Sequence, residues 1–185
     1  MVKALLVAFA LVSLAELGDK TQLTLLTLSV KYKANKVIAG AATAYVFLCL
    51  IAVVLGTIIF ELVPSTYIKI ASSLFFIIFG IYSLIKKPEE ESEEIKKGKG
   101  GFLTTLGLIG LTEFGDKTQL ITIALAAKFK QPVAVFLGSF LGLTAIGIIS
   151  VTAGRLVLKF VKNIGLLHKL AGVVFIVLGV VTYFA

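Results

Sequence analysis

Residues 16–23 read ELGDKTQL, and residues 113–120 read EFGDKTQL. The two octapeptides differ at one position, and each lies inside a stretch of sequence that is otherwise apolar and uncharged. Charged side chains are rare in such stretches because moving an unpaired charge out of water is unfavourable. The repetition of so unfavourable a pattern predicts both an internal duplication and a functional site.

The composition places these stretches in a lipid bilayer. Of the 185 residues, 58% are hydrophobic, which exceeds the apolar share of ordinary soluble domains. A helix needs about 20 apolar residues to cross a bilayer. The sequence predicts an all-α, polytopic membrane protein with six transmembrane helices, in residues 4–30, 37–60, 70–85, 102–127, 133–154 and 170–185.

The similarity between the two halves extends beyond the motif, since Gly40, for example, matches Gly138. Because three is an odd number, a three-helix unit ends on the opposite side of the membrane from its start. A second copy that follows directly is therefore inverted relative to the first, as in many secondary transporters. The predicted organisation is one membrane domain with two inverted three-helix repeats at 1–85 and 102–185, joined by a linker at 86–101.

Small residues in the second predicted helix of each repeat indicate close packing. Gly40 and Ala44 are four positions apart, a spacing that lets helices approach closely in lipid. Cys49 is the single cysteine, and we interpret it as an apolar packing residue. His168 is the single histidine, and we expect it at the surface of the fifth loop.

Positive charges predict the orientation. Counted over the predicted loops, twelve Lys and Arg residues fall in loops one, three and five, and four fall on the opposite side. Positive residues favour the cytoplasmic side, so we expect a multi-pass plasma-membrane protein with both termini outside and the central loop cytoplasmic. The same short-loop positions argue against a nucleic-acid partner despite the net charge of +8. The linker has the composition of a solvated loop. The alternative is that its glutamates form a cation sensor.

Four of the ten acidic residues lie at membrane depth, and all four belong to the motifs. Five others lie in the linker, and Glu61 lies at the end of the second predicted helix. On a continuous helix, Glu16 and Asp19 share a face, and so do Glu113 and Asp116. If the inverted copies face each other, the four carboxylates converge near the midplane of the membrane.

A cluster of carboxylates suits a hard divalent cation. Ca²⁺, Mg²⁺ and Mn²⁺ prefer oxygen ligands, and the motifs contain no His or Cys for softer metals. Gly18 leaves room for close backbone approach or for a local break in the helix. The predicted metal ligands are Glu16, Asp19, Glu113 and Asp116, with Thr21, Gln22, Thr118 and Gln119 as further oxygen donors and Lys20 and Lys117 as charge-balancing residues.

The two Glu-x-Gly-Asp-Lys-Thr sequences, one in the first predicted helix of each half, resemble the motif of the GDT family of Golgi and bacterial Ca²⁺/Mn²⁺:H⁺ antiporters. The resemblance covers essentially the whole chain. It implies cation/proton exchange with the motif acids in the ion path, which correspond here to Glu16, Asp19, Glu113 and Asp116. It also extends to the neighbouring residues Lys20, Thr21, Lys117 and Thr118.

The predicted function is secondary active transport that exchanges a divalent cation, Ca²⁺ or Mn²⁺ or both, for protons. The cation and the protons are substrates, no cofactor and no enzyme activity are predicted, and a homo-oligomer is compatible with the sequence. The alternatives are a passive divalent-cation channel and a small-solute exporter with an intramembrane carboxylate. An intramembrane phosphotransferase is disfavoured because Arg155, the single arginine, lies far from the motifs and Arg is the usual phosphate clamp. A purely structural alternative is a pair of buried Glu–Lys bridges that hold two helices together.

Overall fold

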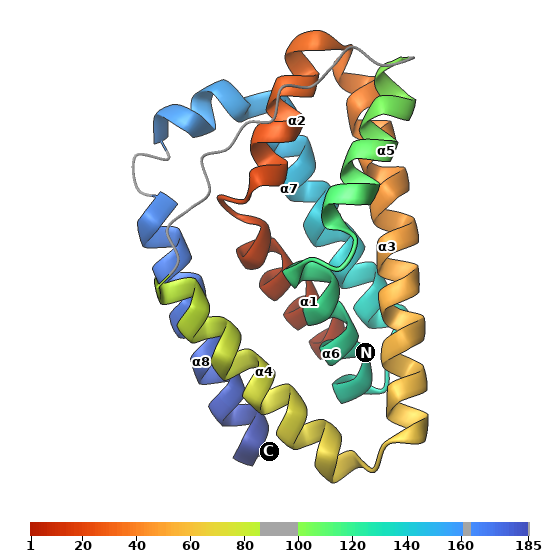
Figure 1. The fold of residues 1–185 in the computed structure, drawn as a ribbon, viewed down its shortest axis with the longest axis vertical. Coiled ribbons are helices and arrows are strands. Elements are labelled where there is room, and N and C mark those ends of the chain that lie inside the picture. Colours follow the sequence, from red (N-terminus) through yellow and green to blue (C-terminus); the bar gives the residue numbers. More distant parts are fainter. Residues whose placement is uncertain (86–99, 161–163, 185) are drawn as a thin grey trace.

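The computed structural model describes residues 1–85, 100–160 and 164–184, with the backbone alone for 154–160 and 164–168. The described residues form helices and no strands (Figure 1). Most of the linker and the predicted surface position of His168 lie outside the described part. The eight described helices are α1 (Val2–Glu16), α2 (Lys20–Lys31), α3 (Ala34–Leu62), α4 (Ser65–Ile85), α5 (Gly101–Glu113), α6 (Lys117–Phe129), α7 (Pro132–Phe160) and α8 (Ile164–Phe184).

The helices predicted at 4–30 and 102–127 are each divided at the motif, so of the two roles considered for Gly18, close backbone approach or a local break, the structure has the break. α1 ends at the Glu of the first motif and α2 begins at its Lys, and α5 and α6 divide the second motif in the same way. The dividing glycine has a positive φ of 79° at Gly18 and 78° at Gly115. Glycine adopts this left-handed conformation readily because it has no Cβ, and the chain leaves the helix there.

The long apolar helices identify a membrane protein. Three described segments are long and apolar enough to cross a bilayer, namely Ala34–Leu62, Ser65–Ile85 and Pro132–Ala153. Shorter apolar helices are Gly101–Glu113 and Lys169–Phe184. The pairs α1–α2 and α5–α6 take the places of the first and fourth predicted spans.

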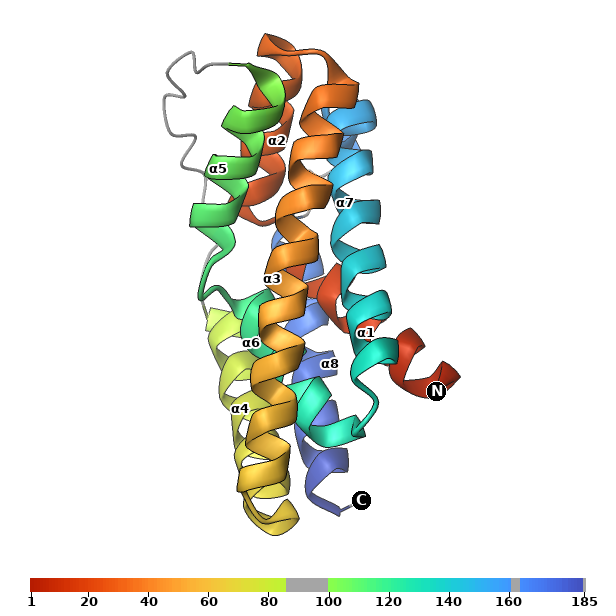
Figure 2. The ribbon, with the colours of Figure 1, turned by 90° about the vertical axis from the view of Figure 1, so that its right-hand side faces the viewer.

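Helices of one half pack mainly against helices of the other half. α4 packs along α8, α1 along α7, and α3 against α5, α6 and α7. In Figure 2, α1 and α2 lead upward to the top of the bundle, whereas α5 and α6 lead downward from it. Both helix breaks lie near the middle of the long axis in Figures 1 and 2, which places the two motifs side by side.

Glycines hold the packed helices at backbone contact distance, and at Gly40 this confirms the predicted packing role. A Cβ added to Gly40 would lie 2.5 Å from the carbonyl oxygen of Phe102 in α5. Where α4 crosses α8, a Cβ on Gly80 would lie 2.6 Å from the carbonyl oxygen of Gly172. Any side chain at these positions would push the helices apart. Cys49 is buried in the core, as predicted.

Candidate cation site

The two helix breaks bring carboxylates of both motifs together. Carboxylate oxygens of Glu16, Asp19 and Glu113 all lie within 4.8 Å of one another. The side chains of Glu16 and Glu113 are only 1% and 2% exposed. Three ionised carboxylates at this separation repel one another strongly in surroundings that contain little water. The arrangement is therefore stable only with positive charge or bound protons among the oxygens.

The acids of one motif do not share a helix face, so that prediction is wrong. Glu16 is the last residue of α1, and Asp19 is the N-cap of α2. Glu113 and Asp116 hold the same positions at the ends of α5 and α6. The break, and not helical periodicity, brings each Glu close to the acids of both motifs. Asp116 lies outside the group of three, but its carboxylate is close enough to interact electrostatically with those of Asp19 and Glu16.

The two glutamates have different surroundings. Thr21 of the first motif and Thr118 of the second both donate a hydrogen bond to Glu113, the latter over 3.2 Å. Neither carboxylate oxygen of Glu16 has a hydrogen-bond partner among the described residues. A buried polar group without a partner is unfavourable and calls for an explanation such as an ion. Glu16 is therefore the member of the cluster with the greatest need for a bound cation or proton.

An ion pair connects the two motifs. The Nζ atom of Lys117 lies 3.0 Å from Oδ1 of Asp19, and the two side chains are 18% and 12% exposed. Within the described ranges Lys20 forms no ion pair. The two motif lysines are therefore unequal, as the two glutamates are, because Lys117 and Glu113 have described partners in the site whereas Lys20 has no described ion pair and Glu16 no described hydrogen bond. The second oxygen of Asp19 and one oxygen of Asp116 also lack a partner among the described residues.

The motif glutamines stabilise the breaks. Oε1 of Gln22 accepts a hydrogen bond from the N–H of Gly18 over 3.2 Å, and Oε1 of Gln119 accepts one from the N–H of Gly115 over 2.7 Å. These N–H groups lie where the helix has ended and regular helical hydrogen bonds stop. Both amide oxygens, which the sequence predicts as metal ligands, thus have their described contacts with the broken backbone.

Tyr45 in α3 lies beside the acids, although the sequence analysis did not select it. Its side chain is 1% exposed, and its hydroxyl has no hydrogen-bond partner among the described residues. Its electrostatic neighbours include Glu16 and Glu113. The sequence distinguishes this position in two ways. Tyr45 is the only hydroxyl-bearing residue in the apolar run 44–56, and the equivalent residue of the second half is Leu143.

A small cavity of about 10 Å³ lies against Glu113. Its polar lining comes from Glu113, Thr118, Gln119 and Thr122, and its apolar lining comes from α3 and α7. This volume is close to the smallest that accommodates one water molecule. The acid cluster therefore has, beside Glu113, a space about the size of one water molecule.

Buried acids at paired helix breaks, in a bundle of apolar helices, are typical of membrane proteins that carry ions. The chain belongs to the family described as "Divalent cation/proton antiporter GDT1", whose model matches residues 4–91 and 101–185. The family suggested by the doubled motif is thereby confirmed. The description is that of a transporter and not of an enzyme family.

Curated relatives agree with this membership. A GDT1-like protein of Synechocystis is 29% identical over 178 residues, covering 85% of this chain and 85% of that protein. A Vibrio cholerae protein named "Putative manganese exporter" is 27% identical, covering 100% of this chain and 92% of that protein. The chloroplastic protein PAM71 of Arabidopsis thaliana is 29% identical, over 95% of this chain and 55% of its own length. No solved structure matches the chain.

Proposed function

We propose that the protein is a secondary active transporter that exchanges a divalent cation for protons at the acid cluster. The observation that carries the proposal is the approach of Glu16, Asp19 and Glu113 within 4.8 Å, with both Glu16 oxygens lacking a partner among the described residues. The description of the family supports exchange with protons. The name of the Vibrio cholerae relative supports Mn²⁺ as one substrate, and an all-oxygen site also suits Ca²⁺.

The proposed ligands are the carboxylates of Glu16, Asp19 and Glu113, with Asp116 at the edge of the site. Thr21 and Thr118 hold Glu113 in place by hydrogen bonds. Broken helices commonly form transporter ion sites because their ends offer backbone groups that a continuous helix has already used. The motif lysines offset part of the negative charge.

The proposed architecture is a pair of inverted three-helix repeats that together cross the membrane six times. The opposite directions of α1–α2 and α5–α6 support this arrangement (Figure 2). The mutual packing of α1 on α7 and of α3 on α5 and α6 supports it as well. Transporters of this plan alternate access by moving one group of helices against another around a fixed site.

The number of charges suggests the stoichiometry. Four ionised motif acids and two protonated lysines leave a net charge of −2 at the site, which one divalent cation neutralises. When the cation leaves, two protons restore the same neutral total. Moving a site with uncompensated charge across a low-dielectric region is unfavourable, so the site moves loaded with metal or loaded with protons. We therefore propose electroneutral exchange of two protons for one divalent cation.

The test is cation uptake by proteoliposomes under an imposed pH gradient, with Mn²⁺ and Ca²⁺ in turn. We expect a gradient acidic inside to drive uptake, with no change when the membrane potential is clamped. Uptake that ignores the pH gradient would contradict antiport and would identify a passive channel. Uptake that follows the gradient but depends on the potential would keep antiport and reject the electroneutral count.

A further inference from the structure

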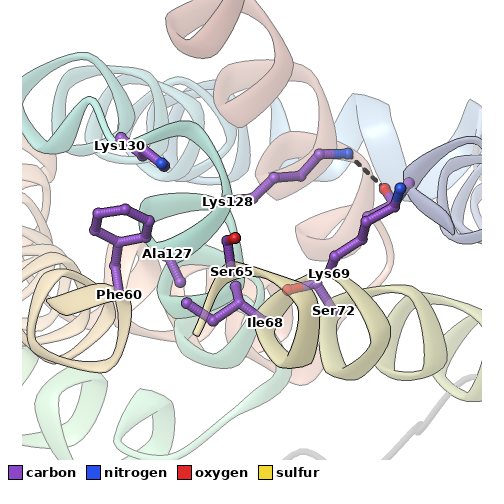
Figure 3. Close-up of a pocket in the computed structure, with 9 residues that line it drawn as sticks. Phe60, Ser65, Ile68, Lys69, Ser72, Ala127, Lys128 and Lys130 are labelled. Carbon is purple, nitrogen blue, oxygen red and sulfur yellow. Dashed lines mark hydrogen bonds between the residues drawn. The ribbon is translucent and has the colours of Figure 1, made fainter. Parts of the chain in front are cut away.

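A second pocket lies at the opposite end of α6 from the cation site. Its volume is about 260 Å³, and it is enclosed by α4, α6 and the last turns of α3 and α8 (Figure 3). The polar part of its lining consists of three lysines and three hydroxyl groups, from Lys69, Lys128, Lys130, Ser65, Ser72 and Thr182. Ser72 and Thr182 are buried, whereas Lys130 is exposed.

The three lysines that line the pocket give it positive charge, and none of them has an acidic partner in the described part of the chain. The described ion pair of the molecule lies elsewhere, at the cation site, and no Asp or Glu lines this pocket. The charge of Lys3 in α1 is close enough to act on Lys128, and it adds to the positive potential at the pocket. Glu61, the acid closest in sequence to the pocket, is exposed and does not line it. Like charges gathered in this way attract an anion.

Contacts hold two of these lysines in the pocket. Nζ of Lys128 donates a hydrogen bond to Oγ1 of Thr182 over 2.5 Å. Nζ of Lys130 lies 4.3 Å from the centre of the Phe60 ring, a cation–π distance. Lys130 also has a left-handed backbone with φ of 55°, which is uncommon for a residue with a side chain. In Figure 3, Lys69 and Lys128 extend toward the same corner of the pocket.

The remaining lining is apolar and indicates an amphiphile. Phe60, Ile68 and Ala127 form the walls around the ammonium groups. Beyond the pocket, α4 exposes apolar side chains that include Ile70 and Leu74. A ligand that matches both parts has an anionic group for the lysines and a hydrocarbon chain for the helix surface. Phosphate-bearing lipids have this combination, and clusters of basic residues recognise their headgroups.

We propose that this pocket binds the headgroup phosphate of an anionic phospholipid, with an acyl chain lying along α4. The phosphate is contacted by Lys69 and Lys128, which extend toward the same corner of the pocket, and accepts hydrogen bonds from the neighbouring hydroxyls, whereas Lys130 adds positive charge from the side of Phe60 (Figure 3). The lipid joins α4 and α8 to the end of α6, whose other end carries the second motif. The site is independent of the proposed exchange reaction.

The test uses the purified full-length protein in detergent, with bound lipid measured by native mass spectrometry. Phosphatidylglycerol, phosphatidylcholine and inorganic phosphate are added separately. The Lys69→Gln/Lys128→Gln/Lys130→Gln variant removes the charges of the pocket. A matched control, with glutamine replacing Lys31, Lys33 and Lys36, removes the same charge from the other end of the bundle. We expect phosphatidylglycerol binding to fall about tenfold or more in the pocket variant and to change less than about twofold in the control.

Three outcomes overturn the proposal. Equal binding of phosphatidylcholine by the wild-type protein shows that charge is not recognised. Equal losses in the two triple variants show general attraction to a basic surface. Saturable binding of inorganic phosphate that displaces the lipid shows that the pocket serves a soluble anion. If the triple variant does not fold, Ser65→Phe at an exposed position fills the pocket while keeping all three lysines, and unchanged lipid binding in that variant also overturns the proposal.

Discussion

Glu16 and Glu113 have equivalent positions in the two motifs, yet their environments are unequal. Glu113 accepts hydrogen bonds from one threonine of each motif, whereas Glu16 has no partner among the described residues. One motif thus supplies a fixed, hydrogen-bonded carboxylate, and the other supplies a carboxylate whose oxygens have no hydrogen-bond partner among the described residues. In a shared site, each has a separate task and neither replaces the other.

Replacing either glutamate with glutamine is therefore expected to abolish exchange. Glu16→Gln and Glu113→Gln each remove one carboxylate from a group whose oxygens lie within 4.8 Å. The double variant is expected to be no worse than either single variant, because residues that act as one unit are not additive. Mn²⁺ uptake by proteoliposomes measures all three. Retention of about half the activity in each single variant, as expected of two independent sites, contradicts the shared site.

The two motif lysines allow a matched comparison. Lys117→Gln removes the ion pair with Asp19 and leaves a partly buried carboxylate without its partner. We expect it to lower exchange about tenfold or more and to lower the thermal unfolding temperature. Lys20→Gln removes the same charge without breaking a described ion pair, so a smaller effect is expected. Equal losses in the two variants would show that total charge matters and the pairing does not.

At the level of the helices, the breaks depend on two glycines. An Ala at Gly115, where φ is 78°, would meet no atom within 4 Å, so its effect is confined to the backbone. We expect Gly115→Ala to destabilise the break by about 1–2 kcal/mol and to reduce exchange. Gly110→Ala in α5 also meets no atom within 4 Å, but there Ala favours the helix by about 0.5–1 kcal/mol.

Thermal unfolding and Mn²⁺ uptake of the two variants provide the measurement. Opposite changes in stability are expected from substitutions only five positions apart. If Gly115→Ala retains full activity and stability, the left-handed turn is not required for the site.

The acids were predictable from the sequence because charges inside apolar runs have few structural explanations. The breaks were only one of two explanations for the motif glycine, since the runs around them have the composition of continuous helices and a glycine in such a run also suits close packing. This difference explains the error about the helix face of the motif acids. A continuous helix predicts a shared face for Glu16 and Asp19, whereas the turn at Gly18 places them on two helices. Gln22, which the sequence offers as a further oxygen donor, accepts a hydrogen bond from the backbone of the break.

At the scale of the whole molecule, charge is distributed unequally between the ends of the bundle. Lys31, Lys33 and Lys36 lie where α2 meets α3, at the top of Figure 1. The pocket lysines lie toward the other end. This separation agrees with the partition of Lys and Arg from which the orientation is predicted, although the linker and much of the fifth loop lie outside the described residues.

The orientation is tested with a single cysteine at Ser92, in a Cys49→Ala background. Because positive residues favour the cytoplasmic side, we expect an impermeant thiol reagent to label this position only when it has access to the cytoplasmic face. A control cysteine at Lys3 is expected to show the opposite accessibility. Labelling of Ser92→Cys from outside intact cells would reverse the predicted topology and the direction assigned to transport.

The packing of each half against the other also has a consequence for biogenesis. A ribosome releases α1, α3 and α4 before α7, α5 and α8, against which they pack, have been made. The glycine-lined surfaces of α3 and α4 therefore remain against lipid while the rest of the chain is inserted, and the carboxylates of the first motif remain without those of the second. Assembly is completed only after synthesis of the final helix, so a defect in the last helices leaves the earliest ones unassembled and open to membrane proteases.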